Sequence, residues 1–442
     1  MPIHTILADI RQVLATGDEL VLEAPPGAGK TTLVPLALLD QPWLQGRILL
    51  LEPRRMAARA AAQRMADLLG EKVGVTVGYR IRQESRVTEC TRIEVVTGGV
   101  LIRLLQDDPA LSPYSLLIFD EFHERSLDSD LGLALALQGR ELLRDSSDPL
   151  KILVMSATLD GAAIATLLGG APLLRSEGRA FPVALHFADM SLRFSDDAAG
   201  PRPLPDLIHA TCHTVMRALM KHAGSILVFL PGQREILSLQ TELQSALASA
   251  QTEGVQIAPL YGSLSLAEQQ TAIHPVQAPY QRKVVLATDI AETSLTIEGV
   301  NIVVDTGLHR SPQFDPRAGL TRLQTGRISQ ASAAQRAGRA GRQGPGVCYR
   351  LWREDEVLAP FAKPEILQAD LAPVALQMLA FGVADPHTLT WLTPPPAGAF
   401  DQALDLLQSL NAITRSDDHC LLTPHGRAMA AFPAHPRLAH MM

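Results

Sequence analysis

A glycine-rich loop followed by a lysine and two threonines is the first segment of the chain whose residue types suggest chemistry. The run Gly27-Ala28-Gly29-Lys30-Thr31-Thr32 directly follows an apolar stretch, 20–24, that we expect to be a strand. Glycines let backbone N–H groups surround a triphosphate, and the N-terminus of the next helix favours an anion. Lys30 is expected to reach the β- and γ-phosphates, and the Thr31 hydroxyl to hold Mg²⁺. The strict pattern has glycine where this chain has Ala24, and a glycine-rich strand-to-helix turn is the alternative.

A second segment, Asp120-Glu121-Phe122-His123, lies at the end of the apolar run 116–120. Ligands of α/β sheets gather at the carboxyl ends of strands, so Asp120 is expected to take Mg²⁺ directly or through water. Glu121 is the candidate base for the water that attacks the phosphate. An acidic pair after a strand is common, and a solvated loop is the alternative. The phosphate loop upstream favours hydrolysis of a nucleotide.

A third segment, rich in arginine and glycine, runs from Gln335 to Arg342 and reads QRAGRAGR. On a helix, Gln335, Arg339 and Arg342 would lie near one face. Guanidinium groups on that face could stabilise the charge that develops on a γ-phosphate, as an arginine finger does. A basic solvated helix or a patch for a phosphate backbone is the alternative. Two internal glycines favour close packing against another element.

Two series of short apolar runs must position these segments. The first series consists of 20–24, 48–52, 93–97, 116–120 and 152–156, with alanine- and leucine-rich stretches at 56–69 and 131–143 between them. The second series consists of 226–230, 256–260, 283–287, 301–305 and 347–351. Nearly continuous apolar runs that alternate with helical stretches are typical of parallel sheets covered on both faces. We therefore predict an α/β protein with two tandem parallel-sheet domains.

The chain after residue 352 has a different pattern. Helical stretches at 371–381, 399–410 and 426–432 flank three consecutive prolines at 394–396. We expect a first domain over 1–177 and a second over 178–351. A small, mostly helical module over 352–425 and the start of a truncated helical domain over 426–442 are expected to follow.

Composition excludes several classes of protein. With 47% hydrophobic and 19% charged residues, the 442-residue chain is not disordered, and its net charge of −7 is not that of a histone-like protein. Basic residues nevertheless concentrate in two regions, from 47 to 103 with eleven against six acidic residues, and from 302 to 353 with nine against two, so a polyanion could bind there. The four cysteines lie far apart, which indicates reduced thiols in a cytoplasmic protein and no zinc site. No apolar run reaches the roughly 18–20 residues of a membrane span.

The order of these segments resembles the superfamily-2 helicases of the DEAH class, most closely the bacterial HrpB-type ATP-dependent RNA helicases. The phosphate loop resembles motif I of this class, DEFH motif II and QRAGRAGR motif VI. The chain also carries EPRRMAARA from Glu52 (motif Ia), TGGVLIR from Thr97 (motif Ib), SAT at 156–158 (motif III), LVFLPGQREI from Leu227 (motif IV) and ATDIAETSLTIEGVNIVVDTG from Ala287 (motif V). Eight motifs in the family's order cover nearly the whole chain. The resemblance implies two RecA-like domains with ATP and Mg²⁺ between them, followed by a winged-helix domain. Phe122 replaces the alanine of DEAH and leaves the chemical residues intact.

The resemblance also implies contacts to the nucleotide that spacing alone does not single out. Arg64 is expected to stack on the adenine. On the other side of the base, Ile273 stands where related enzymes have an aromatic residue, which implies a weak grip on adenine. Asp289 and Thr296 are expected to bind the nucleotide from the second domain.

Further residues are implied to bind the strand or to couple it to ATP. His123 and Gln335 would connect motifs II and VI. Coupling is expected of Ser156, Thr158 and Ser294. The expected contacts to a single nucleic-acid strand are Arg54, Arg55, Thr97, Gly98, Gly232, Thr288 and Thr293.

The function implied is that of a monomeric RNA helicase or translocase that hydrolyses ATP and moves 3′ to 5′ along single-stranded RNA. A DNA-directed motor of the same fold, a P-loop ATPase or kinase indifferent to nucleic acid, and a non-catalytic RNA-binding scaffold stay open. QRAGRAGR and the paired basic regions argue against the second of these, and intact Lys30, Asp120 and Glu121 against the third. Phosphate contacts carry no base information, so binding is expected to be sequence-independent and salt-sensitive.

Overall fold

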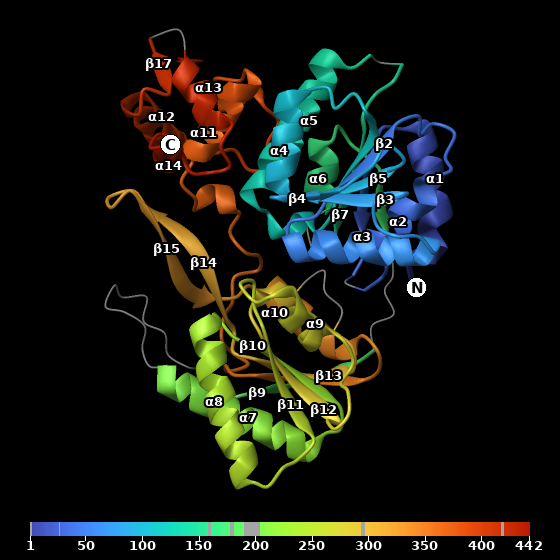
Figure 1. Ribbon diagram of the computed structural model, residues 1–442, viewed down its shortest axis with the longest axis vertical. Coiled ribbons are helices and arrows are strands. Elements are labelled where there is room, and N and C mark those ends of the chain that lie inside the picture. Colours follow the sequence, from blue (N-terminus) through green and yellow to red (C-terminus); the bar gives the residue numbers. More distant parts are fainter. Residues whose placement is uncertain are drawn as a thin grey trace. The chain divides into compact units, whose positions relative to one another are not determined.

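The computed structural model describes residues 2–25, 27–145, 147–157, 161–176, 181–189, 204–292, 297–416 and 420–442. The chain groups into two compact units (Figure 1). The first unit contains residues 1–178, 314–321 and 363–442, and the second contains 179–313 and 322–362. The first unit is therefore discontinuous in sequence, because the second is inserted into it.

The first unit is built on a sheet whose described strands run in the order β4-β3-β5-β2-β6-β7-β1-β8. Every neighbouring pair is parallel except β3 and β4. The carboxyl ends of the central strands therefore meet at one edge of the sheet. The strands are β1 (Glu19–Glu23), β2 (Arg47–Leu51), β3 (Val77–Ile81), β4 (Glu84–Arg86), β5 (Ile93–Val96), β6 (Tyr114–Phe119), β7 (Lys151–Ser156) and β8 (Leu173–Arg175).

Two sets of helices cover the two faces of this sheet (Figure 1). Helices α1 (Leu7–Thr16), α2 (Lys30–Leu38) and α3 (Arg55–Leu69) share one core cluster with the sheet. Helices α4 (Gly98–Asp107), α5 (Leu127–Leu143) and α6 (Gly161–Leu167) share the other. Successive side chains of a strand point to opposite faces, so both must be apolar here, and the continuous apolar runs follow from that. Short 3₁₀ turns, η1 (Pro2–Ile6) and η2 (Phe122–Glu124), precede α1 and α5.

Residues 363–442 form a small module inside the first unit. It contains a two-stranded antiparallel sheet and four helices in the described part of the chain. Side chains of α11, including Leu376 and Met378, belong to the same hydrophobic cluster as α4 and α5, so the module and the large sheet share a core. That the module is a winged helix stays a prediction. Its elements are η5 (Glu365–Leu367), α11 (Ala372–Phe381), η6 (Pro386–Thr388), α12 (Ala397–Ser409), β17 (Ile413–Arg415), β18 (Cys420–Leu422), α13 (Pro424–Ala430) and α14 (Pro436–Ala439).

The second unit contains a sheet in the order β11-β12-β10-β13-β16-β9, with every neighbouring pair parallel. Helices α7 and α8 pack on one face of it. The strands are β9 (Val183–Phe187), β10 (Ser225–Phe229), β11 (Val255–Leu260), β12 (Arg282–Ala287), β13 (Val300–Asp305) and β16 (Gly346–Arg350). The helices are α7 (Leu204–Lys221), α8 (Gln233–Ser249), α9 (Leu266–Ile273) and α10 (Gln330–Gly338), with 3₁₀ turns η3 (Asp289–Ala291) and η4 (Arg339–Gly341).

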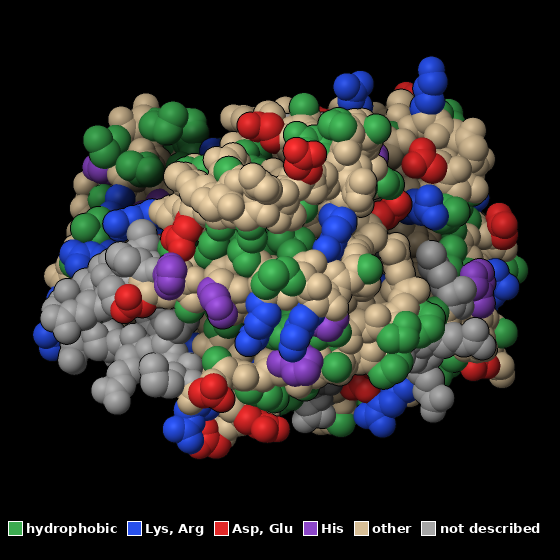
Figure 2. Space-filling view, turned by 90° about the horizontal axis from the view of Figure 1, so that it is seen from below, with side chains coloured by type: hydrophobic (Ala, Val, Ile, Leu, Met, Phe, Trp, Pro, Cys, Tyr) green, Lys and Arg blue, Asp and Glu red, His purple; other side chains and the backbone are tan. Residues whose placement is uncertain are grey.

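A hairpin of β14 (Leu308–Asp315) and β15 (Leu320–Arg327) follows β13, and its tip, 314–321, groups with the first unit. The surface charges of the molecule are mixed: in Figure 2, Lys, Arg and His side chains gather near the middle of one face, with acidic side chains toward its rim. In the second unit, two basic side chains lie against the ring of Tyr349. The His186 ring stacks on it at 5.0 Å, and the Arg217 guanidinium lies 5.2 Å from its ring centroid.

The predicted α/β fold with two parallel sheets is confirmed. Each of the ten predicted strands is present with its ends shifted by at most two residues, as β1, β2, β5, β6, β7, β10, β11, β12, β13 and β16. Among the described residues, no helix combines the length and apolar character needed to cross a bilayer. The described His, Cys, Asp and Glu side chains likewise form no group of three that could hold a metal ion.

Candidate nucleotide and nucleic-acid site

The glycine-rich loop joins β1 to α2 at the carboxyl edge of the first sheet. Gly27 and Gly29 adopt φ angles of 82° and 94°, in the left-handed region where glycine has no Cβ penalty. This backbone starts α2 at Lys30 and leaves the first N–H groups of the helix without partners inside the helix. Such a helix start favours a phosphate.

Lys30 and Thr31 face the acidic pair that follows β6. Lys30 is only 3% exposed, and its Nζ lies 2.9 Å from Oε1 of Glu121 and 3.8 Å from Oδ1 of Asp120. The Thr31 hydroxyl donates a hydrogen bond to the other oxygen of Asp120. The loop and motif II, about 90 residues apart in sequence, therefore form one constellation of an ammonium, a hydroxyl and two carboxylates.

The loop after Asp120 is held in an unusual backbone conformation. Glu121 has a φ of 49°, and its N–H donates to Oδ1 of Asp120 at 2.8 Å. The ring of Phe122 is 1% exposed and packs edge-on against Phe119 at 5.9 Å between centroids. A non-glycine residue in the left-handed region costs energy and is tolerated where surrounding contacts over-determine it. The buried Phe122 ring supplies such a contact, while the carboxylate of Glu121 turns toward Lys30.

Lys30 is surrounded by more negative than positive charge. A third carboxyl group, Glu52 at the end of β2, is fully buried, and neither of its oxygens has a hydrogen-bond partner among the described residues. Burial, and then the carboxylates of Asp120 and Glu121, raise the pKa of Glu52 well above its ordinary value. Burial lowers the pKa of Lys30, but Glu121 and Asp120 outweigh this, so its pKa is raised overall.

This excess of negative charge suits a hard divalent cation. Three buried carboxyl groups stand against the one ammonium of Lys30, and burial raises the pKa of Asp120 as well. Mg²⁺ takes oxygen ligands and usually binds through one or two carboxylates together with substrate phosphates. The hydroxyl of Thr31 and the carboxylate of Asp120 are adjacent oxygen donors of this kind. The residues present therefore fit a magnesium ion.

The other residues predicted at this edge lie close to motif II. His123 Nδ1 lies 3.4 Å from Oε2 of Glu121 and accepts a hydrogen bond from the Ala157 N–H at 3.4 Å. Ser156 is fully buried at the end of β7, and its carbonyl accepts from the N–H of Ala24 at 2.9 Å. His123 thus connects motif II to motif III. Thr158 lies outside the described residues.

The predicted strand contacts of the first unit occupy the same edge. Arg54 precedes α3 and pairs with Glu124, its Nε 3.2 Å from Oε2. Thr97 is the N-cap of α4, and Gly98 begins that helix in a buried position. Arg55 and Arg64 are exposed on α3, so nothing in the structure assigns Arg64 to a base.

In the second unit, the QRAGRAGR segment is more buried than a solvated basic helix would be. Gln335 is 5% and Arg339 is 4% exposed, and Nε of Arg339 donates to the carbonyl of Glu292 at 2.9 Å. Helix α10 ends at Gly338, so Arg339 lies in the turn η4 and Arg342 follows it, whereas one continuous helix was expected. The turn is closely packed, because a Cβ at Gly341 would lie 2.5 Å from the Phe181 carbonyl.

Gly232 and Thr288 follow strands β10 and β12 of the second unit. Gly232 is the N-cap of α8. A Cβ at this position would lie 2.4 Å from Nη1 of Arg310. Thr288 is the N-cap of η3, and Asp289 begins that turn with an exposed side chain. Thr293, Ser294 and Thr296 lie outside the described residues. Ile273 is half-buried at the end of α9.

Sequence reasoning missed three residues of these networks. Glu52 was read only as part of a motif, although an acidic residue that ends a buried strand is a signal in itself. Arg336 is 1% exposed and binds the carboxylates of Asp305 at 3.0 Å and Glu292 at 2.8 Å, which raises its pKa although burial opposes this. The spacing of arginines did not show which of them points inward. Arg125, four residues after Glu121, is the third.

A buried phosphate loop with its acidic pair on one parallel sheet, and an arginine-bearing turn on a second, define a P-loop nucleoside triphosphatase of the two-domain helicase type. The sequence matches the family model for the DEAD/DEAH box helicase over residues 6–167 and that for the helicase conserved C-terminal domain over residues 207–344. The chain therefore belongs to the DEAD/DEAH box helicases.

Relatives support the same assignment. The chain is similar to the ATP-dependent RNA helicase HrpB of Escherichia coli (strain K12), at 46% identity over all of this chain and 52% of that protein. It is 37% identical to human ATP-dependent RNA helicase DHX33 over 99% of this chain and 61% of that protein. A crystal structure of the E. coli DEAH/RHA helicase HrpB superposes with a TM-score of 0.89, covering all of this chain and 54% of that one. The predicted RecA-like domains are thereby confirmed. The chain spans about half the length of the HrpB proteins it matches.

Proposed function

We propose that this protein is an ATP-dependent RNA helicase or translocase, which couples hydrolysis of Mg²⁺-bound ATP to 3′-to-5′ movement along single-stranded RNA. The observation that carries the proposal is the buried constellation of Lys30, Thr31, Asp120 and Glu121. The names of the relatives, which are ATP-dependent RNA helicases, support RNA as the nucleic acid.

Each residue of the constellation has a separate task. The N–H groups at the start of α2 and the ammonium of Lys30 bind the phosphates, in place of the carboxylates that Lys30 contacts without nucleotide. Thr31 and Asp120 would hold Mg²⁺, which would supply positive charge to the phosphates. Glu121 accepts the proton of the attacking water. His123, which lies against the carboxylate of Glu121, orients it.

The second unit supplies positive charge in the transition state. Arg339 and Arg342 follow α10, and the hydrogen bond from Arg339 to the Glu292 carbonyl ties them to motif V. Arginine fingers stabilise the charge on a transferring phosphoryl group. We assign Gln335 to the same step, together with Asp289 and the motif V residues Ser294 and Thr296.

The strand is held through its backbone. Arg54, Arg55, Thr97 and Gly98 form the grip of the first unit, and Gly232, Thr288 and Thr293 that of the second. Guanidinium, hydroxyl and N–H groups are phosphate donors, so affinity falls with salt and ignores base sequence. Contacts to 2′-hydroxyls distinguish RNA from DNA.

We further propose the domain organisation given above, with RecA-like domains over 1–177 and 178–351, a winged-helix module over 352–425 and the start of a helical domain from 426. A cytoplasmic monomer is the working form. The shared core of α11 with α4 and α5 supports a module that stays attached to the first domain.

The steady-state ATPase rate with and without single-stranded RNA at fixed salt tests this function. RNA is expected to raise kcat severalfold, more than DNA of the same length does. Glu121→Gln is expected to reduce kcat by about 10²–10⁴-fold, the contribution of a general base. The control is Glu141→Gln, on the exposed side of α5. An ATPase rate indifferent to RNA in a chain that also fails to bind labelled RNA would refute the proposal.

A further inference from the structure

The loop that follows motif II is bonded directly to the C-terminal module. The carbonyl of Arg125 accepts a hydrogen bond from the Glu365 N–H at 3.1 Å, and its Nη2 donates to the Thr393 hydroxyl at 2.9 Å. The Glu365 carboxylate in turn accepts from the Leu127 N–H at 2.8 Å, at the start of α5. Residues 238 and 268 positions away from the loop thus hold it from both sides.

Arg125 itself is held rigidly. It is 8% exposed, and its guanidinium binds Asp130 through two hydrogen bonds of 2.9 and 3.0 Å. Its φ is 48°, so a second residue of this short loop, besides Glu121, lies in the left-handed region. Its N–H donates to the Phe122 carbonyl at 3.0 Å. A backbone segment held in this way is rigid, so a displacement of one end also moves the other end.

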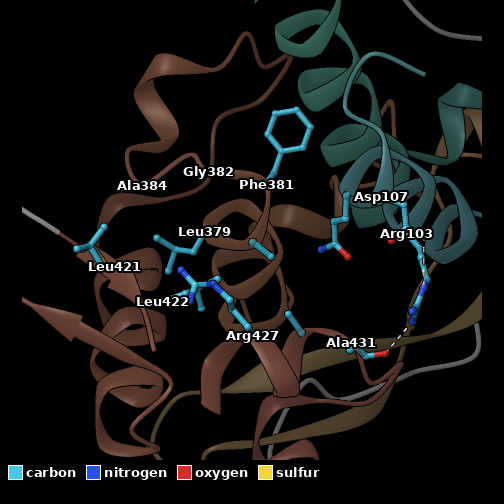
Figure 3. A pocket seen from close by; sticks show the side chains of 14 residues that line it. Arg103, Asp107, Leu379, Phe381, Gly382, Ala384, Leu421, Leu422, Arg427 and Ala431 are labelled. Carbon is cyan, nitrogen blue, oxygen red and sulfur yellow. Dashed lines mark hydrogen bonds and ion pairs between the residues drawn. The ribbon is translucent and has the colours of Figure 1, made fainter. Parts of the chain in front are cut away.

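The same module also contacts the helix that begins at the predicted strand grip. Arg103 of α4 donates to the carbonyl of Ala431 at 2.8 Å, as Figure 3 shows at the edge of a cavity of about 480 Å³. Gln106 and Gln377 pair one turn further along α4. At the other end of α4, a Cβ on Gly98 would lie 2.3 Å from the Cβ of Asp128, so the start of α4 also meets the start of α5, which directly follows the motif II loop.

We propose that Arg125 is a positioning residue, through which the module of residues 363–442 holds the motif II loop in register with α4. Displacement of α4 when a strand binds at Thr97 and Gly98 then reaches Glu121 by two routes, across Gly98 and Asp128 and through the module to Arg125. We call the contacts of Glu365 and Thr393 with residues 125–127 the brace, and the hydroxyl of Thr393 is its side-chain contact to Arg125. This inference rests on the proposed function, because it concerns how RNA stimulates hydrolysis.

The test compares variants of Thr393, because this residue touches neither the phosphate loop nor the predicted strand contacts. Thr393→Val keeps the shape and removes the hydrogen bond to Arg125. Basal kcat and the affinity for labelled RNA are expected to stay unchanged, while the RNA-stimulated kcat falls by about fivefold, the effect of one lost hydrogen bond of roughly 1 kcal/mol. Thr393→Ser restores a hydroxyl and is expected to restore stimulation.

Two controls separate the brace from general stability. Thr388→Val removes a hydroxyl that bonds only inside the module, to Asp385, and is expected to leave stimulation intact. Arg125→Lys keeps the charge but cannot make the two-pronged bond to Asp130, and is expected to lower stimulation at least as far as Thr393→Val.

The outcomes are distinct. Normal stimulation in Thr393→Val, or an equal drop in its basal and stimulated rates, overturns the brace and leaves the proposed function standing. Absence of stimulation in the unchanged chain overturns both. A selective loss in Thr393→Val that Thr393→Ser repairs supports both.

Discussion

At the scale of single residues, the site is a balance of charges around Lys30. Its ammonium faces Glu121 and Asp120, and Glu52 lies behind them with no hydrogen-bond partner among the described residues. Without nucleotide and metal, the buried carboxyl groups outnumber the buried cation. Because burial raises the pKa of Glu52 and of Asp120, stability should depend on pH there.

The raised pKa of Glu52 predicts a stabilising substitution with a defined pH dependence. A carboxyl whose pKa is higher in the folded chain stabilises that state fully at acid pH, and the contribution is lost as pH rises from about 4.5 through the folded pKa. Glu52→Gln removes this loss. The difference in urea-unfolding free energy, variant minus unchanged chain, should grow as pH rises above about 5, by up to about 1.4 kcal/mol per pH unit. A difference that stays constant over this range would contradict a raised pKa, and Glu89→Gln, at an exposed site, is the control.

The pair between Arg54 and Glu124 predicts a gain in affinity for RNA. Glu124 holds the guanidinium that we assign to the strand phosphate, so a phosphate must displace a carboxylate. Glu124→Gln should tighten binding of labelled single-stranded RNA by about twofold to fivefold, since a partly exposed pair is worth roughly 0.2–1 kcal/mol. Fluorescence anisotropy at constant salt measures this. Weaker binding by the variant would mean that Glu124 positions Arg54 for RNA and does not compete with it.

The residues of the site could be predicted from the sequence, whereas the residues that position them could not. Lys30, Thr31, Asp120 and Glu121 stand in local patterns that few other chemistries require. The proposed role of Arg125, by contrast, depends on its contact with Thr393, 268 positions away, and no local sequence pattern predicts that contact. The role of Arg336 could not be predicted for another reason: QRAGRAGR contains three arginines, and only the packing shows that Arg336 is the one that binds Asp305 and Glu292.

At the scale of elements, a buried lysine of a neighbouring strand caps the C-terminal end of helix α9 in the second unit. Lys283 of β12 is fully buried, and its Nζ donates to the carbonyls of Ala272 and His274 at 2.6 Å each. These carbonyls belong to the last turn of α9 and its C-cap, which lack partners inside the helix. Burial lowers the pKa of Lys283 to about 8, although Glu298 opposes the shift.

This cap predicts a second pH dependence, of opposite sign to that of Glu52. Between pH 8 and about 10.5 the unfolded lysine binds more protons than the folded one, so the folded state gains stability as pH rises. Lys283→Met removes the donor to two carbonyls and should lower the free energy of unfolding by about 1–3 kcal/mol. The loss in urea-unfolding free energy should be larger at pH 10 than at pH 8. Lys221→Met, at the exposed end of α7, should show no such trend.

Strands proved easier to predict than their neighbours. Nine of the ten predicted strands lie inside their sheets and are largely buried, so their apolar runs are nearly unbroken, whereas β11 is a half-buried edge strand. The strand β9 escaped prediction because it lies at the sheet edge with its central residues exposed, which leaves a short and mixed pattern. The start of α5 was placed at 131 and lies at Leu127, because Ser126 caps the helix ahead of its apolar run.

At the scale of the whole molecule, the first unit is completed by residues that follow the second in sequence. A chain ending at residue 362 would expose the faces of α4 and α5 that α11 covers. Burial of one large apolar side chain is worth roughly 1.5–3 kcal/mol, and several are involved. The truncated chain is therefore expected to melt at lower temperature or to aggregate, as scattering and calorimetry would show. Equal stability of the two chains would mean that the module contributes little to the core.

The insertion also fixes an order of events during protein synthesis. The ribosome releases the part of the first unit up to residue 178, then the whole of the second unit, and only then the module that covers α4 and α5. At about 5–20 residues per second, that apolar surface waits on the order of ten to forty seconds. During this interval the phosphate loop has been synthesised, but the apolar faces of α4 and α5 are still uncovered. Exposed apolar surface of this kind is what chaperones bind.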